Sequence, residues 1–203
     1  MSTNSPLIIV ISAPSGTGKT TIVKELINTN ENLIASVSYT TRKKRANEVD
    51  GKDYNFISSE LFSSMVEEKS FLEHAKVFDC FYGTPIKEVE ESLKKGLNVI
   101  LEIDWQGAAQ VRQKLPDTQS IFIFPPSLNA LRDRLENRAQ DDLETVDKRM
   151  SSAFEEISHR HEFDYLIVND RFDTALVQLE AVVAGEGAER RPRRARAAVR
   201  ELQ

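Results

Sequence analysis

The sequence predicts an α/β fold in which helices cover both faces of a parallel β-sheet. Residues 7–11 form a continuous apolar run, LIIVI, which is typical of a central strand buried on both faces. Further apolar runs alternate with amphipathic helical segments along most of the chain, and this alternation indicates parallel pairing. Because such sheets bind ligands beyond the carboxyl ends of their strands, the loops that follow the strands are where we expect chemistry.

The individual elements follow from local patterns. Residues 19–28 place Ile22, Val23, Leu26 and Ile27 on one helical face. Later in the chain Pro85 opens a helix that Gly96 ends, and Ser127 is placed to cap a helix over 128–137. Three more strands are predicted, at residues 98–104, 120–124 and 165–168.

The region between residues 33 and 84 has a different pattern, typical of a small mixed insertion. It contains the alternating segment 36–39, a hairpin signal at Asp50-Gly51, a short strand at 54–57 and a short helix near 59–69. We therefore divide the chain into a core of residues 1–33 and 85–184, an insertion at 34–84 and a basic tail at 185–203.

Composition limits the class of protein. The chain has 203 residues, 40% of them hydrophobic, which is enough for a buried core, and its single cysteine, Cys80, excludes an intramolecular disulfide. The net charge of −5 argues against nucleic-acid binding by the body of the chain, although six arginines fall between residues 190 and 200. No segment resembles a signal peptide or membrane span, so we expect a cytoplasmic protein that does not bind membranes.

A phosphate-binding loop follows the first strand. Residues 13–20 read APSGTGKT and match the pattern of a P-loop, except that Ala13 replaces its first glycine. Glycines at 16 and 18 let backbone N–H groups form an anion nest, Lys19 can reach the β- and γ-phosphates, and the Thr20 hydroxyl can bind Mg²⁺. The alternative is a glycine-rich turn with a chance Lys-Thr pair, but the flanking strand and helix favour the P-loop.

A candidate acceptor site lies in the insertion. Arg42 and Arg45 follow the segment SYTT, and Tyr54 follows the Asp50-Gly51 turn. Guanidinium groups and phenol hydroxyls suit a phosphate monoester, yet from the residues alone a solvated basic loop is an equal alternative.

Nine features in order make the sequence resemble the guanylate kinase family, in particular its bacterial members, from about residue 7 to 184. They are GTGKT, SYTTRKKR, GKDYNF, FLEHAKVF, YGTP, ILEIDWQG, FPPS, the segment between Arg138 and Arg149, and IVND. The resemblance implies a P-loop nucleoside monophosphate kinase fold with a parallel core, a GMP-binding insertion and a helical lid at about 134–149. It also implies transfer of the γ-phosphoryl group of ATP to GMP, with Mg²⁺.

The resemblance assigns roles to residues of this chain. It implies that the GMP phosphate is held by Arg42, Arg45, Tyr54 and Tyr82, and that guanine is surrounded by Ser38, Glu73, Thr84 and Asp104. A carboxylate such as Glu73 can accept from both the N1–H and the 2-amino group of guanine, whereas adenine offers neither donor. The ATP side is assigned to residues 13–20 (Ala13, Pro14, Ser15, Gly16, Thr17, Gly18, Lys19 and Thr20) and to Asn169.

The lid and the metal complete the expected site. The resemblance implies that Arg138 and Arg149 close on the ATP phosphates, while Arg134 could equally be an ordinary surface charge. Glu102 stands where the family usually has aspartate and is expected to reach Mg²⁺ through water, and Ala139 replaces a usual lid glycine. No catalytic base is expected, because the attacking phosphate oxygen is already ionised.

Two other classes fit part of the pattern. Some guanylate-kinase-like domains in scaffolding proteins have lost catalysis. Against that class stands the retention of Lys19, Thr20, Arg42, Arg45, Arg138 and Arg149. Another P-loop kinase, acting on a sugar phosphate, is the second alternative, and Glu73, Thr84 and Asp104 favour a guanine base instead. The oligomeric state is left open.

Overall fold

The computed structural model describes residues 6–137 and 143–185. Five strands form one sheet in the order β2-β7-β1-β8-β9. They are β1 (Ile8–Ser12), β2 (Leu33–Ala35), β7 (Asn98–Glu102), β8 (Gln119–Phe124) and β9 (Tyr165–Val168). The pairs β2–β7 and β8–β9 are parallel. The predicted α/β fold with a parallel sheet is therefore confirmed, and the expected strand at 98–104 ends two residues early, at Glu102.

The chain divides into two compact units, each with its own set of candidate site residues. The first unit comprises Met1–Val10 and Asn32–Thr118, and the second comprises Ile11–Glu31 and Gln119–Gln203.

The first unit holds a second, four-stranded sheet in the order β4-β3-β6-β5. Its strands are β3 (Tyr39–Thr40), β4 (Asn55–Phe56), β5 (Phe71–Val77) and β6 (Cys80–Pro85). β5 and β6 form an antiparallel hairpin that the sequence analysis missed, with both turn residues, Phe78 and Asp79, at positive φ. The hairpin predicted at Asp50-Gly51 is wrong: Gly51 does make a turn at positive φ, but β3 and β4 pair in parallel.

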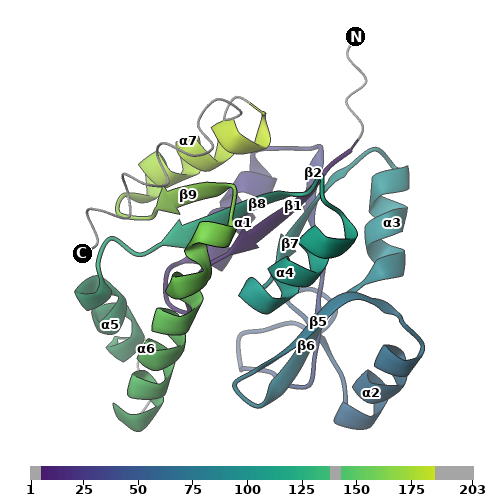
Figure 1. The fold of residues 1–203 in the computed structure, drawn as a ribbon, viewed down its shortest axis with the longest axis horizontal. Helices are drawn as coiled ribbons and strands as arrows, with labels where there is room; N and C mark the ends of the chain where they lie inside the picture. The colour runs from purple at the N-terminus through teal and green to yellow at the C-terminus, as the bar shows by residue number, and fades with distance from the viewer. Residues whose placement is uncertain (1–5, 138–142, 186–203) are drawn as a thin grey trace. The chain divides into compact units, whose positions relative to one another are not determined.

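Three helices belong to the first unit: α2 (Ser59–Glu67), α3 (Ile86–Lys94) and α4 (Trp105–Lys114). The Ser58 hydroxyl caps α2 by accepting from Leu61 N, and the helix ends two residues before the predicted boundary. Its buried Phe62 stacks on Phe71 of β5 and Phe81 of β6, with ring centroids 4.7 and 5.4 Å away. This aromatic stack fixes α2 against the hairpin (Figure 1).

The second unit holds α1 (Lys19–Asn28), α5 (Leu128–Glu136), α6 (Leu143–Ser158), a 3₁₀ turn at His159–Glu162 and α7 (Phe172–Val183). The predicted Ser127 cap is confirmed, because its hydroxyl accepts from Ala130 N at 3.0 Å. α5 and α6 lie side by side (Figure 1). Their contact is a buried cluster made of Leu131, Leu135, Val146, Met150 and Ala153.

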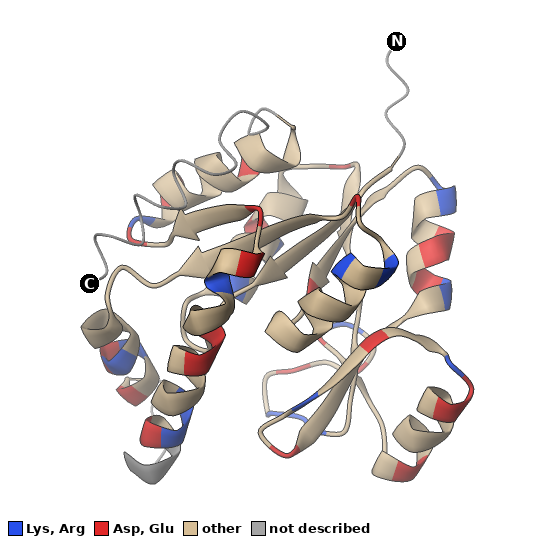
Figure 2. Cartoon of the chain, in the orientation of Figure 1, with Lys and Arg blue, Asp and Glu red and all other residues tan. Residues whose placement is uncertain are grey.

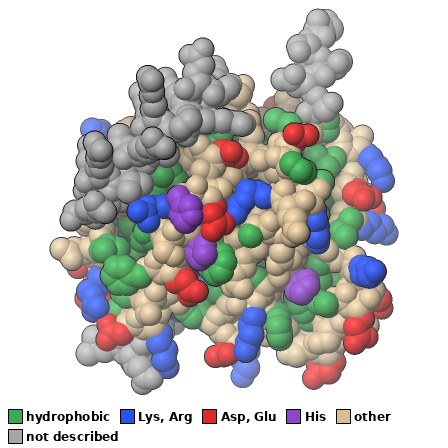
Figure 3. All heavy atoms as spheres, viewed as in Figure 1, with side chains coloured by type: hydrophobic (Ala, Val, Ile, Leu, Met, Phe, Trp, Pro, Cys, Tyr) green, Lys and Arg blue, Asp and Glu red, His purple; other side chains and the backbone are tan. Residues whose placement is uncertain are grey.

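Charged side chains of both signs are interspersed over the described surface. Both acidic and basic positions occur along α3 and α6 (Figure 2), and the face drawn in Figure 3 carries lysines and arginines among aspartates and glutamates. Among the described helices, none combines the length and the apolar character needed to cross a membrane.

Candidate functional site

The loop after β1 has the backbone shape of an anion-binding turn. Gly16 and Gly18 have φ values of +90° and +93°, a region that residues with a Cβ rarely enter. Gly18 is the N-cap of α1, and Lys19 and Thr20 are the first two residues of that helix. The first N–H groups of a helix have no intrahelical acceptor, so the loop presents donors and the positive end of the helix dipole to an anion.

The loop is fastened to the rest of the second unit by two side chains. The buried amide of Asn169 donates from Nδ2 to the Thr17 carbonyl at 2.8 Å. Arg134 donates to the same carbonyl and to the Asn169 carbonyl, both at 3.4 Å. Arg134 therefore holds the loop in shape, a role that its place on a predicted helix surface did not reveal.

Gly16 also has a packing role. A Cβ at this position would lie 3.0 Å from Leu135 Cδ2 and 3.2 Å from Leu131 Cδ1, so the loop backbone sits directly on α5. The remaining loop residues, Ala13, Pro14 and Ser15, are buried or half-buried, and the Pro14 carbonyl accepts from Thr17 N.

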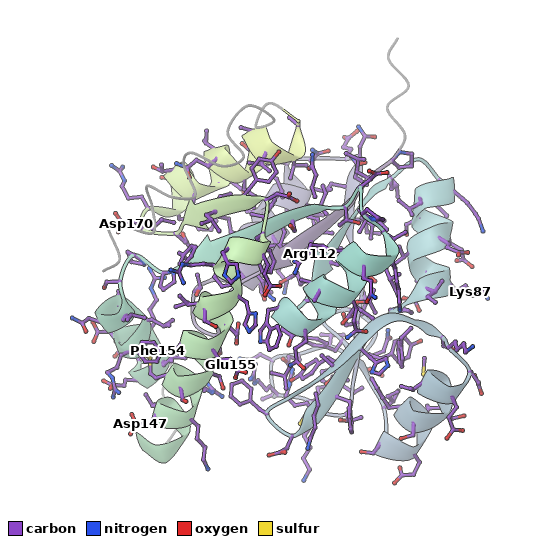
Figure 4. All side chains as sticks on the ribbon, in the orientation of Figure 1. Lys87, Arg112, Asp147, Phe154, Glu155 and Asp170 are labelled. Carbon is purple, nitrogen blue, oxygen red and sulfur yellow. The ribbon has the colours of Figure 1, made fainter. Side chains whose placement is uncertain are left out.

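The predicted lid is described only in part. Arg149 lies half-buried on α6, one turn from Val146, whereas Arg138 and Ala139 fall outside the described residues. Arg132 of α5 pairs with Asp147 of α6 at 2.9 Å. Phe154, on the same helix (Figure 4), is 53% exposed and lies outside the buried α5–α6 cluster.

In the first unit the structure brings Arg42, Tyr54 and Tyr82 together. The guanidinium carbon of Arg42 lies 5.3 Å from the centroid of the Tyr54 ring, and the Tyr54 and Tyr82 rings are 6.0 Å apart. Burial, reinforced by the nearby Glu102 and Tyr82, raises the pKa of Tyr54 to about 12, so its hydroxyl keeps its proton and remains a donor. Two phenols and a guanidinium form a site suited to a phosphate.

A residue that the sequence analysis missed, Glu48, sits among the arginines of this cluster. Its carboxylate accepts from Arg42 Nη1 at 3.0 Å and Nη2 at 2.8 Å, and from Arg45 N at 2.8 Å. The hydrogen bonds from Arg42 lower the pKa of Glu48 despite partial burial. An acid six residues after Arg42, in a turn that also contains Arg45, was the only signal available in the sequence.

Glu73 and Thr84 form the buried polar pair of the second sheet. They face each other across β5 and β6 with exposed fractions of 2% and 0%, and the Thr84 hydroxyl donates to Glu73 Oε1 at 2.5 Å. Burial, helped by the negative charge of Asp104, raises the pKa of Glu73 to about 7, although the bond from Thr84 opposes this rise. A carboxylate so deeply buried with few partners is suited to receiving donors from a ligand.

Gly107 makes room for that carboxylate. A Cβ on Gly107 would lie 2.3 Å from Glu73 Oε2, closer than any van der Waals contact. Gly107 is in the first turn of α4, so glycine at this helical position is explained by the approach of Glu73.

Asp104 and Ser38 complete the predicted guanine group. Asp104 is the N-cap of α4: its Oδ1 accepts from Gly107 N at 2.9 Å and its Oδ2 from Gln106 Nε2 at 3.0 Å. Ser38 is 9% exposed and its carbonyl accepts from Asn55 N. Asp104 thus has a structural task that the sequence pattern, an acid at the end of a strand, did not separate from ligand binding.

The alternation of side chains along β6 explains how the phosphate and guanine groups come together. Tyr82 and Thr84 are two residues apart on one strand, so their side chains point to the same face, about 7 Å apart along the strand. In the neighbouring strands Thr40 is opposite Tyr82 and Glu73 is opposite Thr84. One sheet therefore places a predicted phosphate ligand and the predicted guanine pair on the same face.

Described His, Cys, Asp and Glu residues nowhere form a group of three that could hold a metal ion. The predicted Mg²⁺ ligands are not such a group: they are an exposed hydroxyl at Thr20 and a single half-buried carboxylate at Glu102. Both supply the hard oxygen atoms that Mg²⁺ prefers, which is compatible with an ion that arrives bound to phosphates.

Comparison with known proteins gives one consistent answer. A family model described as guanylate kinase matches residues 5–186. A guanylate kinase from Saccharophagus degradans is 54% identical over 87% of this chain and 86% of its own length, and one from Legionella pneumophila (strain Lens) is 49% identical over 90% and 88%. The crystal structure of a guanylate kinase from Anaplasma phagocytophilum superposes with a TM-score of 0.76 at 37% identity, covering 90% of this chain and 86% of that one.

The hydrogen bond from Asn169 to the Thr17 carbonyl can be tested by measuring the stability of a variant that lacks it. Asn169→Ala removes a buried donor and leaves the Thr17 carbonyl with a weaker partner, so we expect the free energy of unfolding to fall by about 1–3 kcal/mol in urea titrations. Asp170→Ala is the matched control, because Asp170 (Figure 4) is exposed at the next position. Equal stability of the two variants would show that the Asn169 bond does not hold the loop.

Proposed function

The chain belongs to the guanylate kinase family. We propose which of its residues bind GMP, which bind ATP and which compensate charge during phosphoryl transfer. The protein is an ATP:GMP phosphotransferase, which reversibly moves the γ-phosphoryl group of ATP to GMP and yields ADP and GDP. One observation supports the assignment of that activity to particular side chains: the buried Glu73–Thr84 pair lies on the same face of the second sheet as Tyr82, which packs with Tyr54 and Arg42.

GMP binds to the first unit with its base and its phosphate on one face of the second sheet. The Glu73 carboxylate accepts from N1–H and the 2-amino group of guanine, while Thr84, Ser38 and Asp104 border the base. Arg42, Arg45, Tyr54 and Tyr82 bind the phosphate and supply charge and hydrogen bonds to it. The insertion at 34–84 is in this assignment the GMP-binding part of the chain, and residues 85–184 with 1–33 are the core.

ATP binds to the second unit through the loop 13–20. Backbone N–H groups of the loop and Lys19 hold the β- and γ-phosphates, and Asn169 and Arg134 keep the loop rigid. Arg138 and Arg149 act as the arginines that compensate charge on the transferred group, within a lid at about 134–149. Transfer of a phosphoryl group passes through a loose transition state, for which placement and charge compensation are the main requirements.

Thr20 and, through water, Glu102 would supply the oxygen donors for Mg²⁺. When bound with ATP, it neutralises charge on the β- and γ-phosphates. We assign no base to the reaction, because the attacking oxygen of GMP is ionised at neutral pH. A cytoplasmic location and an absence of nucleic-acid or membrane partners stay predictions.

The assignment is tested by ADP release from MgATP with GMP, IMP, AMP or ribose 5-phosphate as acceptor. We expect strong preference for GMP over IMP, which lacks the 2-amino group, and at least a ~100-fold lower kcat/KM in Lys19→Ala, corresponding to about 2.7 kcal/mol of transition-state stabilisation. Lys87→Ala is the control, because Lys87 is exposed on α3 (Figure 4). Equal use of IMP and GMP would contradict the role of Glu73.

The pKa of Glu73 predicts a pH dependence of GMP recognition. The carboxylate form accepts both guanine donors, and with a pKa of about 7 only about a tenth of it is ionised at pH 6. The KM for GMP is therefore expected to fall about tenfold between pH 6 and pH 8. Because the GMP phosphate also titrates near pH 6, the comparison is with Glu73→Gln, which should lose the part of the slope due to Glu73.

The raised pKa of Glu73 affects folding stability in the opposite direction: a rise in pH favours GMP binding but lowers the free energy of unfolding. The folded chain binds this proton more tightly than the unfolded chain, so between about pH 4.5 and 7 ionisation of Glu73 lowers the free energy of unfolding as the pH rises.

Gly107→Ala tests the space around Glu73. Alanine favours the helix by about 1 kcal/mol, but its Cβ displaces the carboxylate. We expect a KM for GMP at least about tenfold higher, a smaller preference for GMP over IMP and an unchanged KM for ATP. Normal GMP kinetics in a folded variant would mean that the Glu73 carboxylate does not need its present position.

A further inference from the structure

We propose that Glu48 is a positioning residue for the acceptor phosphate: by binding Arg42 and Arg45 together, it holds the Arg42 guanidinium ready for GMP in the absence of substrate. The inference rests on the proposed role of Arg42 in binding the GMP phosphate. It adds a residue that does not itself touch the nucleotide but decides the geometry of one that does.

The first support is the geometry of the Arg42–Glu48 pair. Both terminal nitrogens of Arg42 donate to Glu48, Nη1 to Oε2 at 3.0 Å and Nη2 to Oε1 at 2.8 Å. The two side chains are only 16% and 15% exposed. A paired, planar fork of this kind fixes direction as well as distance, and partial burial protects it from screening by salt.

The second support is that Glu48 also anchors the neighbouring arginine. Its Oε2 accepts from the backbone N–H of Arg45 at 2.8 Å, and its Oε1 lies 3.7 Å from Arg45 Nη1. The backbone closes the same turn, because Glu48 N donates to the Arg45 carbonyl at 3.2 Å. One carboxylate thus organises the turn that carries both predicted phosphate-binding arginines.

The third support is the contact of the Arg42 guanidinium with the rings of Tyr54 and Phe56. The guanidinium carbon lies 5.3 Å from the Tyr54 centroid and 5.6 Å from that of Phe56, so rings constrain the group on its face while Glu48 constrains it in its plane. The bonds to Glu48 and the bond from Nη1 to the Lys43 carbonyl at 2.8 Å use three of the five N–H groups of arginine. The Tyr82 hydroxyl interacts with Arg42 as well, which accounts for a fourth N–H group and leaves one for a ligand.

Charge explains why Glu48 supports the site instead of blocking it. Two arginines and one carboxylate leave a net positive charge, and a phosphate dianion is attracted to that charge more strongly than a second carboxylate would be. The Arg42 bonds keep the pKa of Glu48 below its ordinary value, so at neutral pH the carboxylate is ionised and the arrangement is intact.

The test is the binding of GMP and of guanosine to Glu48→Gln, measured by calorimetry on the full chain. Glutamine has the same shape but only one acceptor oxygen, so Arg42 can no longer be held by both nitrogens. We expect affinity for GMP to fall at least about tenfold while affinity for guanosine and the KM for ATP stay unchanged. Glu67→Gln, an exposed glutamate on α2, is the matched control for loss of one negative charge.

Two additional arms make the result decisive. In an Arg42→Ala background, Glu48→Gln is expected to cost little more, because Glu48 acts through Arg42. Unchanged or tighter GMP binding by Glu48→Gln would overturn the inference and indicate that Glu48 competes with the phosphate. An equal loss of guanosine and GMP binding would also overturn it, as a general effect on folding. If Arg42→Ala itself bound GMP normally, the proposed phosphate site would fail, independently of Glu48.

Discussion

The structure of the first unit has to accommodate a carboxylate with almost no access to water. Glu73 loses its hydration in the folded chain, and an uncompensated buried charge is expensive. Its surroundings show how the cost is limited: Thr84 donates to it across the strand pair, and Gly107 leaves it space. The bond from Thr84 does not fully offset the burial, which raises the pKa of Glu73 to about 7. In the proposed GMP site, the N1–H and 2-amino groups of guanine would donate to this carboxylate and complete its compensation.

In the proposed phosphate site of the first unit, the charge that needs compensation is positive. The guanidinium groups of the neighbouring Arg42 and Arg45 repel each other. Glu48 and the rings of Tyr54 and Phe56 confine Arg42 without using all its donors. In the second unit, the loop that follows β1 presents backbone N–H groups, and its shape is kept by Asn169 and Arg134.

Several features were readable from the sequence because they depend on neighbours along the chain. The first helix, the Ser127 cap and the apolar strands are local patterns, and all appear where the spacing predicted them, to within two residues at the ends. The hairpin at Asp50-Gly51 was predicted by the same local logic and failed. The turn at Gly51 does form. However, the next strand, β4, pairs with β3 in parallel, and a turn signal cannot reveal the direction of pairing.

The family, and with it the reaction, was determined by the sequence alone, because several motifs occur in one order and each keeps its residue types. What only the tertiary structure decided is how distant residues satisfy one another: that Glu48 binds Arg42, that Gly107 accommodates Glu73, and that Arg134 and Asn169 meet at the carbonyl of Thr17. Residues 17 and 169 are far apart in the chain, and their contact exists only once β1 and β9 belong to one sheet. Hydrogen bonds and excluded volume act through space, so no pattern of spacing along the chain specifies them.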